Sequence, residues 1–196
     1  MSETLDKKFI LKKDFPPYSA ILSVVILMVL LMRLQGRIWW CKIGDYAPWT
    51  LDAWSTHTSQ HLFDPYTLTH VLHGVMFFWL VNLLFRRMKL VWQFFIAMTI
   101  EAAWEVAENT NAVIELYRQN TASLDYFGDS IFNSVGDVFA CAAGFYIACK
   151  LGWKRSLFFF LLTEIVLLFW IRDSLLLNIL MLIYPLDSVK SWQTGM

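Results

Sequence analysis

Long apolar stretches separated by short polar connections dominate this chain. A helix needs about 20 mostly apolar residues to cross a bilayer. The pattern predicts spanning helices at about 18–34, 68–85, 90–108, 128–151 and 156–171. A sixth apolar segment, about 175–184, is too short to span simply and is expected to be re-entrant or interfacial. We therefore expect an all-α polytopic membrane helix bundle, with residues 1–196 forming a single integral membrane domain.

The density of lysine and arginine alternates between successive connections, which predicts the orientation of the helices. Basic residues gather in the tail 1–17 and in the connections 86–89 and 150–155, whereas the loops 35–67 and 109–127 carry few. Cytoplasmic loops are enriched in Lys and Arg. We expect a cytoplasmic N-terminal tail, a retained first helix rather than a cleaved signal peptide, and both long loops on the opposite side of the membrane.

The composition is typical of a membrane protein and argues against a nucleic-acid partner. The chain is 58% hydrophobic, only 16% charged and has a mean hydropathy of +0.50, whereas soluble domains are nearer a quarter charged. The formal net charge is zero and no basic patch alternates with aromatic residues, so we expect no nucleic-acid partner. The three cysteines make no disulfide framework.

Ionisable residues inside the predicted helices collect toward one side of the membrane. His70 and His73 share a face of the second helix, and Glu101, Glu105 and Glu108 form a stripe on the third. Charged groups at membrane depth are costly and usually functional. Under the predicted orientation, all five lie in the outer halves of their helices. A hydrogen-bonded network that only fixes the helix packing is the alternative.

The fourth helix carries a second polar series and a stripe of small residues. Asp129, Asn133 and Asp137 recur every four positions, beginning at the outer end. Ser130 follows Asp129 and is a candidate substrate-binding hydroxyl. Small residues also recur every four positions, which predicts close approach of a neighbouring helix; they are Gly136, Ala140 and Gly144.

Two further candidate groups lie outside this cluster. His57 and His61 are four residues apart in the loop 35–67 and could extend a metal site or bind a metal at the surface, although solvated polar histidines are the more common case. Arg172, at the end of the fifth helix, could hold an anionic headgroup. Imidazole and carboxylate ligands together suit a divalent metal such as zinc. No HExxH motif occurs, so the cofactor stays open.

The polar motifs also carry a resemblance. The segments HVLHG at 70–74, EAAWEVAEN at 101–109, SLDYFGDSIFNSVGD at 123–137 and IRDSLLLNILMLIYPLD at 171–187 resemble a family of proteobacterial inner-membrane proteins known as domain of unknown function 2585, or UPF0314. The resemblance implies a bacterial inner-membrane location and no particular activity. Residues 70–146 are also similar, more faintly, to VanZ-like proteins, through Asp129, Asn133, Gly136 and Gly144; that chemistry does not transfer.

The leading functional hypothesis is a membrane-embedded enzyme with its site at the periplasmic leaflet, hydrolysing or transferring a group on a lipid or lipid-linked substrate. The alternatives are a non-catalytic membrane assembly subunit, which would have a protein partner, and an ion-coupled transporter. The candidate catalytic residues are Glu101, Glu105 and His73; the candidate substrate-binding residues are Arg172, Asn133 and Ser130; the candidate metal ligands are His70, His73, Asp129 and Asp137.

Overall fold

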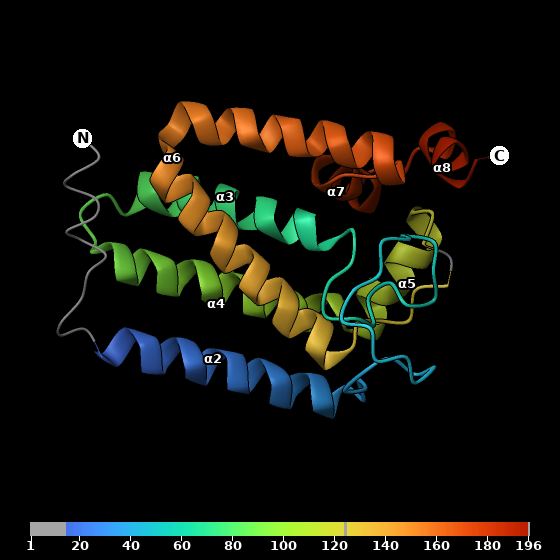
Figure 1. Ribbon diagram of the computed structural model, residues 1–196, viewed down its shortest axis with the longest axis horizontal. Coiled ribbons are helices and arrows are strands. Elements are labelled where there is room, and N and C mark those ends of the chain that lie inside the picture. The colour runs from blue at the N-terminus through green and yellow to red at the C-terminus, as the bar shows by residue number, and fades with distance from the viewer. Residues whose placement is uncertain (1–14, 124, 196) are drawn as a thin grey trace.

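A crossing between two helices forms the centre of the computed structural model, which describes residues 15–123 and 125–195. Helix α3 (Thr67–Leu84) packs against the first half of α6 (Ile131–Ile171) (Figure 1). A Cβ on Gly144 would overlap the carbonyl oxygen of Val71, and one on Gly74 would overlap that of Cys141. The predicted close approach at the small-residue stripe is therefore confirmed at Gly144, and it brings the polar faces of two helices together.

Two further helices flank this crossing. Helix α4 (Leu90–Glu108) contacts α3 and α6, and α2 (Phe15–Leu34) packs against α4. The core between them is apolar and includes Met28, Met32, Met98 and Phe145, all nearly inaccessible to solvent. These helices begin and end close to the predicted residues, because continuous apolar stretches bounded by Pro, Arg and Lys mark their ends.

Helix α6 breaks once, at Gly152, where the backbone has φ 70° and ψ 174°. The two predicted helices at 128–151 and 156–171 are the two arms of this element, which turns back on itself at the break (Figure 1). Glycine adopts positive φ without the penalty that a side chain brings. The second arm then reaches α7 (Leu175–Ile183), where the buried carboxylate of Glu164 accepts hydrogen bonds from the backbone N–H groups of Leu175 and Leu176.

The long connections gather at one end of the molecule. The loop between α2 and α3, the short helices α5 (Asn111–Asn120) and α8 (Asp187–Thr194), and α7 lie there, opposite the bend in α6 (Figure 1). The segment 109–127, expected to be a loop, thus contains α5. The basic connection between α3 and α4 lies at the other end, with the bend. Lys7, Lys8, Lys12 and Lys13, which carried the expectation of a cytoplasmic tail, lie outside the described residues.

The number of membrane-spanning helices is smaller than predicted. Within the described residues, only α3 and α4 are long and apolar enough to cross a membrane on their own; counting α6 and α7, bent by 73° at the short break between them, as one span gives up to three. The expectation of five spans is corrected accordingly, since the apolar part of α2 is short and the two arms of α6 form one bent element.

Large apolar side chains nevertheless cover the outside of the bundle. They include Leu22, Ile26 and Leu30 on α2, and Phe158, Ile165 and Phe169 on the second arm of α6. Extended apolar surfaces of this kind mark contact with a membrane or another protein. Together with α3 and α4, they indicate that this all-helical protein associates with a membrane.

Candidate functional site

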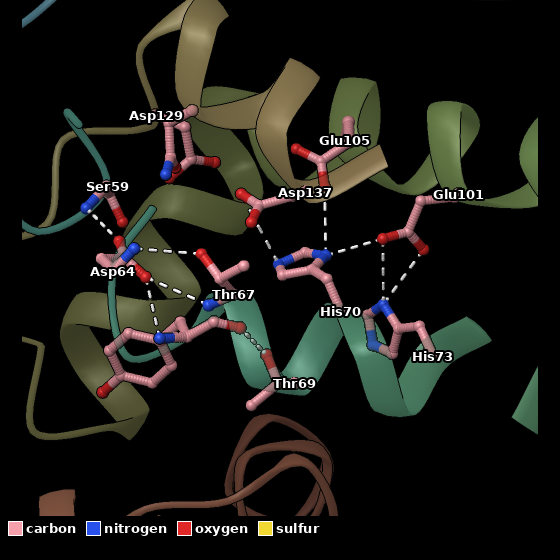
Figure 2. A network of polar contacts seen from close by, with 12 residues as sticks. Ser59, Asp64, Thr67, Thr69, His70, His73, Glu101, Glu105, Asp129 and Asp137 are labelled. Atoms are coloured by element: carbon pink, nitrogen blue, oxygen red, sulfur yellow. Dashed lines mark hydrogen bonds and ion pairs between the residues drawn. The ribbon is translucent and has the colours of Figure 1, made fainter. Parts of the chain in front are cut away.

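One carboxylate is shared by two histidines at the α3–α4 interface (Figure 2). Nδ1 of His70 lies 2.6 Å from Glu101 Oε1, and Nδ1 of His73 lies 3.0 Å from Glu101 Oε2. Glu101 is completely buried, and both histidines are nearly so. Because each Nδ1 faces the carboxylate, Nε2 is the nitrogen of each ring that remains for other partners. This arrangement orients both imidazoles, as a carboxylate hydrogen-bonded to a histidine does in metal and acid/base sites.

Two more acidic residues approach His70. Glu105 Oε1 lies 3.3 Å from His70 Nδ1, and Asp137 Oδ2 lies 3.9 Å from His70 Nε2. Both oxygens of Glu105 and Oδ1 of Asp137 are buried without a hydrogen-bond partner among the described residues. The single N–H on His70 Nδ1 already points to Glu101 and does not serve Glu105 as well. Protons or a cation must balance this excess of acidic over basic groups, because buried charges are not left unpaired.

Asp129 belongs to a separate hydrogen-bonded frame at the end of α4. Asn109 Nδ2 donates to Asp129 Oδ2 at 2.8 Å, the backbone N–H of Asp129 donates to Asn109 Oδ1 at 2.7 Å, and the Tyr126 hydroxyl donates to Asp129 Oδ2 at 3.0 Å. Burial raises the pKa of Asp129 above its ordinary value. These bonds make Asp129 part of the supporting frame of the pocket, with its oxygen Oδ2 already occupied.

Sequence reasoning missed several polar residues that the fold adds. Besides Asn109 and Tyr126, they include Asp64, which accepts hydrogen bonds from the backbone N–H groups of Tyr66 and Thr67 at the start of α3 and from that of Ser59. Burial raises the pKa of Asp64. An Asp before Pro at a helix start is a recognisable capping signal, and Asn109 continues the four-residue spacing from Glu105.

These groups surround a pocket with mixed walls. Its polar lining includes His70, His73, Asp137 and Asn133, and one wall is apolar. That wall comes from α7 and its end: Leu175, Ile179 and Leu182. Its interior volume of about 80 Å³ gives room for several water-sized groups. Glu108, Asp64 and Asp129 also reach it, whereas Glu101 and Glu105 do not line it. The two glutamates predicted to act as a base thus lie behind the histidines.

The remaining predicted residues are placed differently. Ser130 is fully buried, caps the start of α6 by accepting from the backbone N–H of Asn133, and donates to the Gln60 carbonyl. Asn133 lines the pocket and donates to the His61 carbonyl at 2.8 Å. Arg172 is exposed, does not line the pocket and donates to the Trp192 carbonyl. The binding of an anionic headgroup by Arg172 therefore stays a prediction, and it would have to occur outside this pocket.

Two sets of residues at this site have the spacing of metal ligands. His70, His73 and Glu101 form one set, and His70, Glu105 and Glu108 form the other; in each, one ligand atom per residue lies within 4.8 Å of the others. The donor chemistry fits a divalent cation, since imidazole and carboxylate are ordinary ligands of zinc and manganese. Because His70 belongs to both sets, the two sets describe neighbouring positions within one site.

The fold and the pocket define a class of protein: an all-helical, membrane-associated protein with a buried cluster of His, Glu and Asp residues. A family model described as "Protein of unknown function (DUF2585)" matches residues 31–195, and the chain belongs to this family. Among its relatives, the UPF0314 protein of Rhizobium meliloti (strain 1021) is 46% identical over 176 residues, covering 90% of this chain and 89% of that protein.

Other relatives extend the family beyond that organism. The UPF0314 protein of Sinorhizobium fredii (strain NBRC 101917 / NGR234) is 45% identical and covers 90% of each chain. That of Paracoccus denitrificans (strain Pd 1222) is 40% identical, covering 92% of this chain and 93% of that protein. No solved structure matches. The family relationship confirms the resemblance carried by the polar motifs, and the names of these relatives state no activity.

Proposed function

We propose that this protein is a membrane-embedded enzyme that hydrolyses or transfers a group on a lipid or lipid-linked substrate. The observation that carries the proposal is the Glu101 carboxylate, which holds His70 and His73 side by side at the wall of a pocket. A carboxylate-oriented imidazole is a common arrangement for proton transfer near neutral pH.

The mixed lining of the pocket supports an amphiphilic substrate. Asp137 and Asn133 offer polar contacts, while Leu175 and Ile179 of α7 offer an apolar wall. The interior has room for the reacting polar group and not for whole acyl chains. The polar end of a lipid would therefore enter, with its chains left among the apolar side chains on the outside of the bundle.

The proposed chemistry divides the roles among the residues. One imidazole accepts a proton from water or from an acceptor hydroxyl through Nε2, and an imidazolium returns a proton to the leaving oxygen. Glu101 positions both rings and stabilises the charged ring, and Glu105 lies behind them. Asp137, 3.9 Å from His70 Nε2, contacts the reacting group or shares a cation with His70. A divalent cation, if bound by His70 and His73, would supply Lewis-acid activation of the same group.

The proposed location follows from the distribution of basic residues. Arg86, Arg87 and Lys89 lie between α3 and α4, at the end of the bundle opposite the long loops. With this end in the cytoplasm, the long-loop end and the pocket face the periplasm of a bacterial inner membrane.

The test is a lipid profile of cells. A deletion strain is complemented with the wild-type chain, with His73→Gln, or with Glu115→Gln as a control at an exposed carboxylate on α5. We expect one lipid or lipid-linked species to change on deletion, to recover with wild type and Glu115→Gln, and to stay changed with His73→Gln at equal protein level. Recovery with His73→Gln would overturn the proposal, as would an unchanged profile in the deletion strain.

A structural role is separated by a second measurement. If His73→Gln loses only stability in detergent, and rescue returns at lower growth temperature, the histidine serves packing and the protein acts as an assembly subunit. Metal analysis of the purified wild type and of a His70→Gln/His73→Gln double variant then distinguishes metal-dependent from metal-free chemistry at the same site.

A further inference from the structure

We infer that the loop between α2 and α3 holds a structural transition-metal ion, of the zinc class, on Cys41, His57 and His61. This position is separate from the buried histidines of α3. One ligand atom from each of the three residues lies within 4.8 Å of the other two. The Cys41 sulfur is 3.4 Å from His57 Nδ1, and the two imidazole centroids are 4.8 Å apart.

The distances fit ligands of one ion. Zinc lies about 2.3 Å from sulfur and about 2.0–2.1 Å from nitrogen, so a tetrahedral zinc places a sulfur and a nitrogen ligand about 3.6 Å apart. The observed Cys41–His57 separation of 3.4 Å is close to that value. His57 and His61 are four residues apart on one turn, in which the His61 N–H donates to the His57 carbonyl. Three residues lie between His57 and His61, and zinc-binding motifs commonly separate two histidine ligands by three to five residues.

His61 supplies the independent observation that points to a ligand. Its side chain is 1% exposed, yet neither ring nitrogen has a hydrogen-bond partner among the described residues. Buried polar groups are almost always satisfied. Trp40 stacks on one face of the ring, with centroids 5.6 Å apart and planes within 4°, which shields the ring from solvent and fixes its direction. A metal ion would satisfy one of these nitrogens.

A fourth ligand is within reach. Asp45 Oδ2 lies 4.0 Å from His61 Nε2, and its side chain is 43% exposed and free to adjust. Its other oxygen accepts from the backbone N–H of Ala47, which orients the carboxylate. Cys, His and Asp are all residues that bind zinc; a water molecule in place of Asp45 would leave the same three protein ligands.

The surrounding loop has reason to need such an ion. Between α2 and α3 it contains little regular structure beyond an isolated bridge between Trp49 and Phe63. It is nevertheless fixed to α6, since Asn133 donates to the His61 carbonyl and a Cβ on Gly136 would overlap the Leu62 carbonyl. A structural metal supplies stability directly to segments that lack a core of their own.

Cobalt substitution tests the site through its thiolate. The untagged protein in detergent is stripped with chelator and titrated with Co²⁺, and thiolate-to-cobalt charge-transfer absorption is followed. We expect one equivalent of Co²⁺ per chain to produce this band and Zn²⁺ to displace it. The candidate ligand sets of the buried site on α3 and α4 contain no cysteine, but Cys141 of α6 interacts with Glu101 there, so the loss of the band in Cys41→Ser is what assigns it to the loop.

Matched variants locate the band. Cys41→Ser is expected to abolish it, whereas Cys149→Ser, at a buried free cysteine of α6, should leave it unchanged. His61→Gln keeps the thiolate and should weaken binding more than about 100-fold, because loss of even an outer-shell partner costs about 10–100-fold. Circular dichroism establishes that each variant is folded, and His61→Gln decides the question if Cys41→Ser does not fold.

Three results would overturn the inference. They are a wild-type protein without the band, a band that survives Cys41→Ser, and affinity unchanged in His61→Gln. Rapid alkylation of Cys41 that is unaffected by added zinc would instead indicate a thiol–imidazole nucleophile made with His57.

Discussion

Replacing Glu101 by glutamine removes the charge that both buried histidines share. Glutamine has the same size and keeps one oxygen, so it can accept a hydrogen bond from one of the rings. Its amide nitrogen then faces Nδ1 of the other ring, where Glu101 presented an oxygen 2.6 Å from His70 and 3.0 Å from His73. That ring must change tautomer or lose its partner, because two N–H groups cannot bond to each other.

The size of the effect follows from these two contacts. A hydrogen bond to a charged group contributes about 1.5–3 kcal/mol, and an unpaired buried donor costs about 1–3 kcal/mol. Weakening one bond and losing the other gives an expected destabilisation of about 3 kcal/mol, near the lower end for breaking a buried ion pair by removing one partner. For a chain of this length that corresponds to a fall of roughly 6–12 °C in the unfolding midpoint.

The assay is thermal unfolding in detergent, followed by the fluorescence of the 10 tryptophans. Glu115→Gln, at a carboxylate whose side chain is 56% exposed, is the control and should shift the midpoint by less than about 2 °C. The reasoning is refuted if Glu101→Gln is as stable as Glu115→Gln. A variant that also fails to restore the lipid profile at temperatures where it is fully folded would further support a positioning role for Glu101.

Burial raises the pKa of Asp129 in the folded protein above its pKa of about 3.9 in the unfolded chain. The protonated carboxyl therefore stabilises the fold at pH values below the unfolded-state pKa, and this stabilisation is lost as the pH rises through the folded-state pKa. Asp129→Asn should therefore gain stability relative to wild type as the pH rises from about 4 to neutral, as measured by unfolding midpoints across that range. Asn109→Ala removes both reciprocal bonds to Asp129 and should cost about 2–4 kcal/mol, measured in the same way. Gly144→Val places side-chain atoms against the Val71 carbonyl and should cost at least about 1–3 kcal/mol, visible as a lower midpoint and reduced yield of folded protein.

Each of these changes has a control at an exposed position. Asp125→Asn, Asn111→Ala and Ala143→Val make the same chemical replacements at residues that are exposed. If Asp129→Asn and Asp125→Asn show the same pH dependence, burial of Asp129 does not govern it. If Gly144→Val is no worse than Ala143→Val, the close crossing of α3 and α6 is not required for stability.

Apolar stretches and helix-period spacing predicted most of the helices and the gathering of polar groups. His70, His73 and Glu101 were placed on facing helices because residues three or four apart share a helix face and the connection between α3 and α4 is short. The stripe at Gly144 was readable for a similar reason. Local pattern is enough to place these residues on their helix faces, since the spacing along each helix determines the face.

Features that depend on the path of the chain in space were not predictable in this way. The basic connection predicted at 150–155 does coincide with the turn at Gly152 in α6, but the number of spans was not predictable from apolar stretches, since five were expected where two or three are supported. Nothing in the loop sequence places Cys41, 16 residues away, beside His57. The hydrogen bond between Asn109 and Asp129 likewise joins the end of α4 to the start of α6, and the spacing of polar residues within each helix does not reveal such a contact.

The sharing of Glu101 between two histidines of α3 has a consequence for how the protein is made. Helices α3 and α4 are consecutive, and synthesis from the N-terminus produces them before α6. Glu101, which is completely buried, can therefore meet His70 and His73 as soon as α3 and α4 have been made. Packing of α6 against them then encloses Asp137 last, when His70 is already in place beside it.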